Sequence, residues 1–382
     1  MKHLLFFKKK NNMNNTLNKN TDFKKRILIT GGMGFIGSHC CRYFVNNYPN
    51  YLIVNFDAMT YAGNPLNVVH LIDRPNFVCV KGDIRNIKDV QTVFEKYQIT
   101  DVIHLAAESH VDRSLFNPNL FAETNILGTL NLMNMAKVAW NNDTDRHVFF
   151  NMGTDEIFGA LDEHGEPFNE TTPLNPHSPY SASKTAQVMF AKTYYEAFGL
   201  PTISMACGNA IGPYQFPEKL VPLTIDRLIH KQNIPIYGEG KQMRDWTNVH
   251  DIVYAIDLIF HKGKIGELYC IGGDACKANI DVVHSLLKEY VQYVNENGNT
   301  ETVEELEKLI TFIPDPRGKS HDFRYDIDHS KITIELGWLP IYTFEDSIKM
   351  VIEWYCTNAE WLNATKNGEY KNFFKLMYDG KL

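Results

Sequence analysis

The chain has 382 residues, of which 44% are hydrophobic and 22% are charged, and its formal net charge is −7. This composition is typical of a soluble globular protein, and the length allows a large core with two structural regions. The negative charge argues against a nucleic-acid partner, and no run approaches the roughly 18 apolar residues of a membrane span. The seven cysteines show no metal-ligand spacing, which predicts no metal site and reduced thiols in a cytoplasmic compartment.

Residues 1–24 are rich in Asn and Lys, and we expect them to form a flexible N-terminal extension. A basic targeting segment is the alternative for this stretch. From Arg26, short β-branched runs alternate with longer segments whose apolar residues have helical spacing. The runs are 27–30, 52–56, 77–80, 102–105, 147–150 and 202–206, and the helical segments are 35–46, 86–98, 124–140 and 181–198. This alternation predicts an α/β fold with a doubly wound parallel sheet over 25–206.

After residue 207 the alternation stops, and prolines and glycines separate shorter elements. Helical patterns remain near 249–262, 280–294 and 343–356, while 295–310 is acidic and indicates a loop followed by a solvated helix. We therefore expect residues 207–382 to form a smaller mixed lobe. Some of its segments should return to the first domain.

The stretch TGGMGFIGS, residues 30–38, connects the first predicted strand to the first predicted helix. Gly31, Gly34 and Gly37 allow a tight turn and the close approach of a pyrophosphate, which would lie at the start of the helix beside Phe35 and Ile36. Asp57 ends the second predicted strand, twenty residues after Gly37. A carboxylate there would accept from a ribose 2′-OH and repel a 2′-phosphate, so the pattern predicts NAD rather than NADP.

Two further strand ends extend the predicted cofactor site. Asp83 and Ile84 follow the third strand and could hold the adenine by one hydrogen bond and one apolar contact. Leu105, Ala106 and Ala107 lie at the end of the fourth strand, where small side chains would let the backbone approach the cofactor. The sequence thus predicts a dinucleotide along one edge of the sheet.

Tyr180 and Lys184 in YSASK are four positions apart and therefore share one helix face. A nearby ammonium and a cationic nicotinamide would favour the phenolate and make Tyr180 a usable base. The stretch NMGTDEIFG places Thr154, Asp155 and Glu156 just after the fifth predicted strand. A capped turn is the simple explanation of Thr-Asp-Glu, and a catalytic acid–base pair is the alternative.

Together these motifs resemble the extended short-chain dehydrogenase/reductase superfamily, and more narrowly its nucleotide-sugar 4,6-dehydratases. The resemblance begins near Arg26 and continues to the C-terminus. It is carried by ILITGGMGFIGS, DAMTYAGN, LAAESHVDRS, TNILGT, GTDEIFG, SPYSASK, GPYQFPEKLVPL, IPIYGEGKQMRDW, LGWLP and TFEDSIKMVIEWY. It implies a Rossmann-type NAD-binding domain over 25–206 that carries the catalytic residues, a substrate-binding lobe over 207–382, and a homodimer.

The resemblance also implies the reaction and its residues. A nucleotide-diphosphate-glucose, either dTDP-glucose or UDP-glucose, would be oxidised at C4, lose water across C5 and C6, and regain the hydride at C6. Tyr180, supported by Lys184, would take the O4 proton while Thr154 hydrogen-bonds O4. Glu156 would remove the C5 proton, and Asp155, kept neutral by burial and by Glu156, would protonate the leaving O6.

Substrate contacts are also implied residue by residue, near the sugar, the diphosphate or the base. They are Ser109, His110, Thr154, Asn209, Lys219, Leu220, Tyr237, Arg244, Asn279, Arg317 and His321. This chain departs from the family pattern in three places. Ala210 and Ile211 follow Asn209 where a second Asn and an aromatic residue are usual, DPRGKSHD contains a one-residue insertion, and Phe158 replaces a tyrosine.

Two other functions remain open on the sequence. A nucleotide-sugar 4-epimerase would need Tyr180, Lys184 and NAD but no acid–base pair for elimination, so the Asp155–Glu156 doublet favours the dehydratase. A non-catalytic NAD-bound regulatory protein could share the fold, since fold does not determine function. Such a protein would usually have lost one of these side chains.

Overall fold

The six predicted strands and one later strand form a parallel sheet. The computed structural model describes residues 22–141 and 146–366, so most of the extension expected at 1–24 lies outside the described residues. Within them, the sheet has seven strands in the order β10-β6-β5-β4-β1-β2-β3, and all neighbouring pairs are parallel. The strands are β1 (Lys25–Thr30), β2 (Tyr51–Asp57), β3 (Phe77–Lys81), β4 (Asp101–His104), β5 (Phe149–Met152), β6 (Thr202–Cys207) and β10 (Leu268–Ile271). The predicted doubly wound fold is confirmed.

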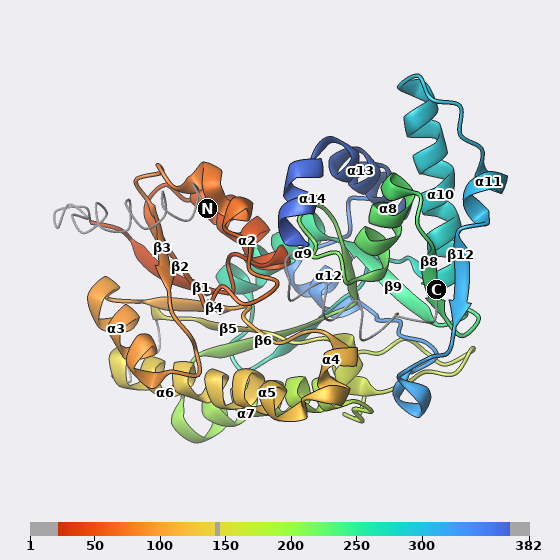
Figure 1. Cartoon of the computed structure of the whole chain (residues 1–382). Coiled ribbons are helices and arrows are strands. Elements are labelled where there is room, and N and C mark those ends of the chain that lie inside the picture. Colours follow the sequence, from red (N-terminus) through yellow and green to blue (C-terminus); the bar gives the residue numbers. More distant parts are fainter. Residues whose placement is uncertain (1–21, 142–145, 367–382) are drawn as a thin grey trace.

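Helices cover both faces of this sheet, which explains why its strands are continuous apolar runs. Because side chains alternate along a strand, Ile27 and Ile29 of β1 pack on one face and Leu28 on the other. Helices α2 (Phe35–Asn47) and α9 (Val249–Lys262) cover the first face. Helices α3 (Ile87–Tyr97), α6 (Thr129–Trp140) and α7 (Pro179–Phe198) cover the second (Figure 1).

Local signals set the ends of α7, the helix that carries Tyr180 and Lys184. Ser178 and Ser181 form a reciprocal capping box, and Pro179 occupies the first turn. The helix ends at Gly199, whose φ of 66° is left-handed, as the Gly-then-Pro exit predicts. By contrast, the helix expected at 124–140 begins as a π-helical stretch, Ala122–Gly128, before it continues as α6.

The second half of the chain forms a smaller lobe with its own apolar core. Its strands are β7 (Asn209–Ile211), β8 (Ile234–Tyr237), β9 (Met243–Asn248), β11 (Cys276–Ala278) and β12 (Ile310–Ile313). Its helices include α8 (Leu220–His230), α10 (Asn279–Glu296), α11 (Val303–Glu307), α13 (Phe344–Thr357) and α14 (Ala359–Thr365). From the same half, β10, α9 and α12 (Ser330–Leu336) pack with the large sheet. Over residues 22–141 and 146–366, no helix is long and apolar enough to cross a membrane.

Strand β5 begins and ends two residues later than the expected 147–150. Side-chain contacts replace strand pairing at the missing positions: the His147 ring stacks on Trp140 with centroids 4.9 Å apart, and its Nδ1 lies 2.6 Å from the Thr100 carbonyl oxygen. The backbone N–H of Val148 donates to the Asp101 carboxylate at 3.0 Å. The shift brings Thr154 close to the end of β5, at the carboxyl edge of the sheet.

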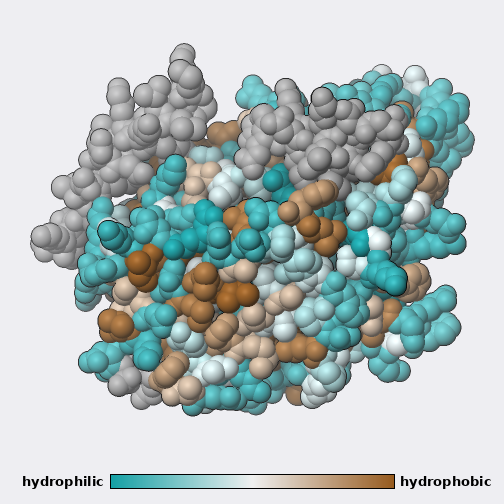
Figure 2. Space-filling view, turned by 60° about the horizontal axis from the view of Figure 1, so that its bottom comes forward, coloured by the Kyte–Doolittle hydropathy of each residue, from teal (hydrophilic) through white to brown (hydrophobic). Residues whose placement is uncertain are grey.

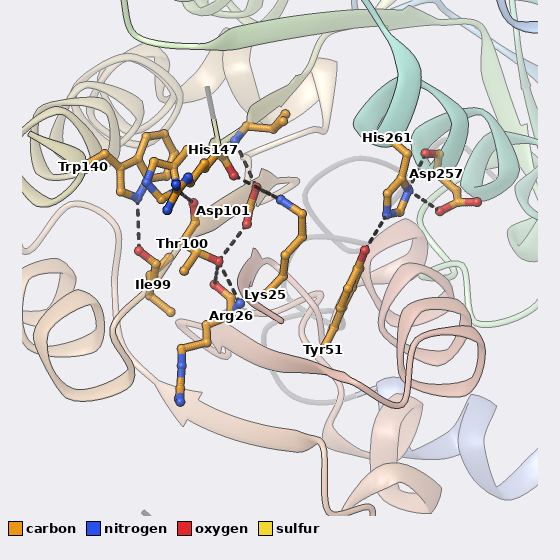
Figure 3. A network of polar contacts seen from close by, with 12 residues as sticks. Lys25, Arg26, Tyr51, Ile99, Thr100, Asp101, Trp140, His147, Asp257 and His261 are labelled. Atoms are coloured by element: carbon orange, nitrogen blue, oxygen red, sulfur yellow. Dashed lines mark hydrogen bonds and ion pairs between the residues drawn. The ribbon is translucent and has the colours of Figure 1, made fainter. Parts of the chain in front are cut away.

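Figure 3 shows the same polar network at the amino edge of the sheet. The Lys25 ammonium on β1 donates to Asp101 on β4 at 2.7 Å, and Asp101 is fully buried. Breaking a buried charge pair by removing one partner is strongly destabilising, so this network ties β1, β4 and the start of β5 together. It lies at the edge of the sheet opposite the ligand cavity described below.

Candidate active site

A cavity of about 440 Å³ follows the carboxyl edge of the parallel sheet. Gly31 comes after β1, Asp57 ends β2, Leu105 follows β4 and Cys207 ends β6, and all four line this cavity. The carboxyl ends of parallel strands meet at one edge, which is where doubly wound folds bind ligands. The cavity continues between the sheet and the second lobe as far as Arg317.

The glycine-rich turn after β1 is shaped for an anion. Gly31 has φ of 72°, and a Cβ there would lie 2.8 Å from the Ala106 backbone, so a side chain at this position is excluded. Helix α2 begins at Gly34 without any capping side chain. The free N–H groups of its first turn therefore fit a pyrophosphate, which would lie at the positive end of the helix.

Asp57 connects this turn to the segment after β2. Its two carboxylate oxygens accept from the backbone N–H groups of Met33 at 2.9 Å and Met59 at 2.7 Å. Burial raises the pKa of Asp57, and these two hydrogen bonds oppose the rise. Each oxygen keeps a second lone pair for a ribose hydroxyl. The residues present thus fit a dinucleotide such as NAD.

All of the predicted cofactor residues line the cavity: Gly31, Gly34, Phe35, Ile36, Gly37, Asp57, Asp83, Ile84, Leu105, Ala106, Ala107, Tyr180 and Lys184. Asp83 is also paired with Arg85, whose guanidinium lies 2.6 Å from the carboxylate. Burial raises the pKa of Asp83, but hydrogen bonds from Arg85 outweigh it and hold that pKa below its usual value. Asp83 is therefore a charged acceptor at neutral pH.

Tyr180, Thr154 and Glu156 line the same cavity, and Tyr180 interacts with both of the others. Burial and the charge of Glu156 raise the pKa of the Tyr180 phenol, while a hydrogen bond with Thr154 lowers it. In the protein alone Tyr180 is therefore a neutral phenol. A positive charge brought beside it by a ligand would favour the phenolate.

Lys184 does not contact the tyrosine hydroxyl through any hydrogen bond among the described residues. Its ammonium donates to the Met152 carbonyl at 2.5 Å and to Gln187 Oε1 at 2.6 Å. Burial lowers the pKa of Lys184 to about 7. Gln187 in turn donates to Asn151 Oδ1 at 2.5 Å, so a buried polar chain links α7 to β5. Sequence reasoning missed Gln187 and Asn151, although Gln187 shares the helix face of Lys184.

The Asp155–Glu156 doublet lies on a short 3-10 turn, Asp155–Phe158. Thr154 caps this turn by accepting from the Glu156 N–H at 3.4 Å, so the capped turn that the sequence also allowed is present. Within it the two carboxyl groups have different surroundings. Glu156 lines the cavity, whereas Asp155 lies behind the wall with an exposure of 1%.

Asp155 is the carboxyl group that keeps its proton. Burial first, and the charge of Glu156 second, raise the pKa of Asp155 to about 8. Its Oδ1 accepts from the Thr154 hydroxyl at 3.1 Å, and its Oδ2 has no hydrogen-bond partner among the described residues. At neutral pH Asp155 is mostly protonated, which is the state that a proton donor requires.

Glu156 faces a group of cations on the substrate side. Burial raises the pKa of Glu156, and the charges of Arg317, Arg244 and Lys219 oppose that rise. Arg317 is held by an ion pair with the buried Asp112. Although burial works against it, the Arg317 charge lowers the pKa of Asp112 to about 2. This part of the cavity therefore combines Glu156, and Asp112 in its ion pair with Arg317, with several positive side chains that suit an anionic ligand.

The predicted substrate residues also line the cavity: Ser109, His110, Thr154, Asn209, Lys219, Leu220, Tyr237, Arg244, Asn279, Arg317 and His321. Of the departures from the family pattern, Ala210 lies in the cavity wall, but Ile211 is fully buried in the core of the second lobe. Arg317 and His321 line the cavity despite the insertion between them. Only Ala210 therefore changes the surface that a ligand would touch at Asn209–Ile211.

Further lining residues were missed by the sequence reasoning. They are Ala58, Thr60, Ala62, Gly63, Thr124, Gln215, Phe216, Glu218, Trp246 and Tyr325, among others. Many of them lie inside or beside motifs that the resemblance singled out, such as DAMTYAGN, TNILGT and GPYQFPEKLVPL. Their place in or beside these motifs was the signal in the sequence by which these lining residues could have been found.

Comparison with known proteins agrees with this geometry. A family described as GDP-mannose 4,6 dehydratase matches residues 28–351. The dTDP-glucose 4,6-dehydratase of Salmonella typhimurium is 40% identical over 371 residues, which cover 93% of this chain and 99% of the relative. Among solved structures, dTDP-glucose 4,6-dehydratase from Bacillus anthracis in complex with NAD has a TM-score of 0.78 at 37% identity, covering 90% and 100% of the two chains.

A second solved structure, the dTDP-glucose 4,6-dehydratase DesIV from Streptomyces venezuelae with NAD and TYD bound, has a TM-score of 0.80 at 34% identity. This match covers 89% of this chain and 100% of the DesIV chain. The family match and the relatives both extend over most of the chain. The chain therefore belongs to the GDP-mannose 4,6 dehydratase family of the extended short-chain dehydrogenase/reductase superfamily.

Proposed function

We propose that this chain is an NAD-dependent dTDP-glucose 4,6-dehydratase that forms the 4-keto-6-deoxy-glucose nucleotide. One observation carries the proposal: the buried Asp155 and the cavity-lining Glu156 are adjacent on one turn, and Thr154 and Tyr180 line the same cavity. Oxidation at C4 would need NAD⁺ as the hydride acceptor and, from the protein, only the Tyr180 phenolate as the base. Loss of water also needs a base and an acid, and the doublet supplies both.

NAD⁺, when bound, would supply the chemistry of accepting a hydride from C4 and returning it to C6. Tyr180 then takes the O4 proton, and Thr154 holds O4 by a hydrogen bond. The C4 ketone acidifies the C5 proton, which Glu156 removes. Asp155 gives its proton to O6, so that the oxygen leaves as water and the C5–C6 double bond forms. Glu156 then returns its proton to C5, which together with the hydride at C6 saturates this bond and gives the 4-keto-6-deoxy sugar.

The cationic end of the cavity would hold the diphosphate. Arg317 and Lys219 line this end, and Arg244 adds a third charge while its guanidinium donates to the backbone carbonyls of residues 243, 322 and 323. Tyr237 and Leu220 provide apolar surface for the base. The proposed preference for dTDP-glucose over UDP-glucose rests on the activity named for the relatives. Ala210 is the position in the cavity wall that departs from the family pattern, so a comparison of the two substrates tests whether this preference is kept here.

Purified protein incubated separately with dTDP-glucose and UDP-glucose tests the proposal. We expect the product of dTDP-glucose to lose one water without net formation of NADH, and to form faster than the UDP product. An isobaric product with inverted C4 would instead identify an epimerase. An unchanged sugar with both nucleotides would identify a non-catalytic NAD-binding protein.

We further propose that the enzyme is a homodimer that pairs through α6, α7 and their neighbours. Figure 2 shows hydrophobic side chains gathered on this face. The exposed ones are Leu115, Phe116, Leu127, Val138, Met189, Tyr195 and Phe198, with Val138 at 71%. Large exposed apolar patches mark interaction sites, and a second copy of the same face would cover these side chains.

We also propose a cytoplasmic location, which the seven free cysteines support.

The dimer predicts a specific effect of charge on this face. Replacing Val138 and Met189 together by Glu should convert the protein to a monomer. The free energy needed to bury the new carboxylates in the interface would exceed the free energy that the contact between the two copies contributes. The molar mass measured by light scattering during gel filtration reports the change. Ile334→Glu is the matched control, since Ile334 is 82% exposed on α12, outside this face. A wild-type monomer, or a double variant that stays dimeric, would contradict the assignment.

A further inference from the structure

Three segments beside the cavity, two loops and helix α4 (Val111–Phe116), meet at the carboxylate of Glu218. The Tyr61 hydroxyl donates to Glu218 Oε1 at 2.9 Å, and Arg113 Nε donates to Oε2 at 3.2 Å. The Arg113 guanidinium also lies over the Tyr61 ring, 3.7 Å from its centroid. The Glu218 side chain is only 3% exposed. These three residues form a charge-assisted cluster in a largely dry environment, where such bonds are strong.

Each member of the cluster comes from a segment that borders a different part of the cavity. Tyr61 belongs to the segment 58–63, which follows Asp57 and lines the cofactor side of the cavity through Ala58, Thr60, Ala62 and Gly63. We call this segment the strap. Arg113 lies on α4 (Val111–Phe116), just after Ser109 and His110. Glu218 immediately precedes Lys219 and Leu220, which line the substrate side.

Hydrogen bonds anchor the strap near both ends. The first is made to the Asp57 carboxylate, and the second, from the residue just after the strap, is made to the glycine-rich turn. Met59 N donates to Asp57 Oδ1 at 2.7 Å, and Asn64 N donates to the Met33 carbonyl at 3.0 Å. The contact between Tyr61 and Glu218 ties its middle to the substrate-binding segment, 157 residues away in the sequence. Lys219 Nζ adds a bond to the Ser109 carbonyl at 2.8 Å, so the same segment is tied to the loop after β4.

We propose that the Tyr61–Arg113–Glu218 cluster couples binding of the nucleotide to retention of NAD. The inference rests on the proposed function, in which the hydride must return to the same sugar and the cofactor must not leave during the cycle. A nucleotide diphosphate held by Lys219 and Leu220 orders residues 217–220. Glu218 then holds Tyr61, and the strap stays closed over the cofactor. Since such coupling is reciprocal, NAD strengthens nucleotide binding by the same factor.

The test measures release of NAD from the holoprotein without turnover. Protein loaded with NAD is mixed with an excess of an enzyme that consumes free NAD, with and without dTDP, and the rate of NAD loss is followed. In the wild type we expect dTDP to slow the release. In Tyr61→Phe the release in the presence of dTDP should be roughly 10-fold faster, as expected for loss of one hydrogen bond to a charged group. The slowing by dTDP should shrink by the same factor.

Tyr43→Phe is the matched control. Tyr43 also donates its phenol hydroxyl to a carboxylate, Asp257, at 3.1 Å, but it does not line the cavity. The release of NAD from this variant should keep the wild-type response to dTDP.

If Tyr61→Phe fails to fold, Glu218→Gln serves instead, because its side-chain amide keeps an acceptor for the Tyr61 hydroxyl and loses the negative charge. A wild type whose NAD release ignores both dTDP and UDP, or variants that respond like the wild type, would overturn the coupling. If the coupling appears but no water is lost from either sugar nucleotide, the proposed function fails and the coupling stands.

Discussion

Glu156→Gln should stop the reaction after oxidation of the sugar at C4. The substrate then keeps its C6 oxygen, because the amide cannot remove the C5 proton, and the near-ultraviolet absorbance of NADH should build up in a single turnover. Loss of a positioned base lowers kcat by roughly 10²–10⁴-fold. Gln preserves the volume of Glu and faces the same cavity, so binding of dTDP should be only slightly altered.

Glu163→Gln is the control for this variant, since Glu163 is exposed in the following loop and does not line the cavity. It should turn over at the wild-type rate. Mass spectrometry of the quenched mixture separates the 4-keto sugar from the dehydrated product. If Glu156→Gln forms the dehydrated sugar as fast as the wild type, Glu156 is not the base at C5.

Asp155→Asn should lower kcat by at least roughly 10²-fold and at the same time make the protein more stable at neutral pH. The pKa of Asp155 is raised from 3.8 to about 8 by burial and by Glu156. Between these two values the native state holds a proton that the unfolded chain releases. The free energy of unfolding of the wild type therefore falls as the pH rises from about 4 to about 8. The variant is neutral in both states and lacks this slope.

Urea unfolding of both proteins at several pH values gives the comparison. The stability advantage of Asp155→Asn should be small near pH 4, grow by at most about 1.4 kcal/mol per pH unit, and level off above pH 8. Asp162→Asn, at an exposed carboxylate of the next loop, is the control. Parallel unfolding curves for Asp155→Asn and the wild type at all pH values would mean that Asp155 is ionised in the native state.

Much of the fold could be predicted because its signals are local. The β-branched runs, the glycine turn after β1 and the Gly-then-Pro exit of α7 depend on neighbours within a few residues. The seventh strand, β10, could not be predicted in this way. Its four residues, Leu268–Ile271, pair with β6, Thr202–Cys207, only after the long segment between the two strands has returned to the sheet.

The candidate site likewise has some features that the local sequence predicts and others that only the folded structure sets. The sequence by itself determined that Thr154 and Asp57 lie at the carboxyl edge of one sheet, since parallel strands end together, and that Tyr180 and Lys184 share one helix face. The resemblance already implied that Asp155 is the acid of the doublet, but only the tertiary structure decided the burial and the charges that keep the proton on it. Asp155 is buried behind the wall and Glu156 faces Arg317, Arg244 and Lys219, which come from the second lobe.

The same physical reason applies to Arg317 and Glu218, whose partners Asp112 and Arg113 are more than a hundred residues away in the chain. A pKa or an ion pair is set by burial and by charges nearby in space, and those come from distant segments. The residue types and their spacing therefore determined the chemistry that this protein can perform. Folding of the second lobe onto the sheet decided the protonation state of each acid and the partner of each cation.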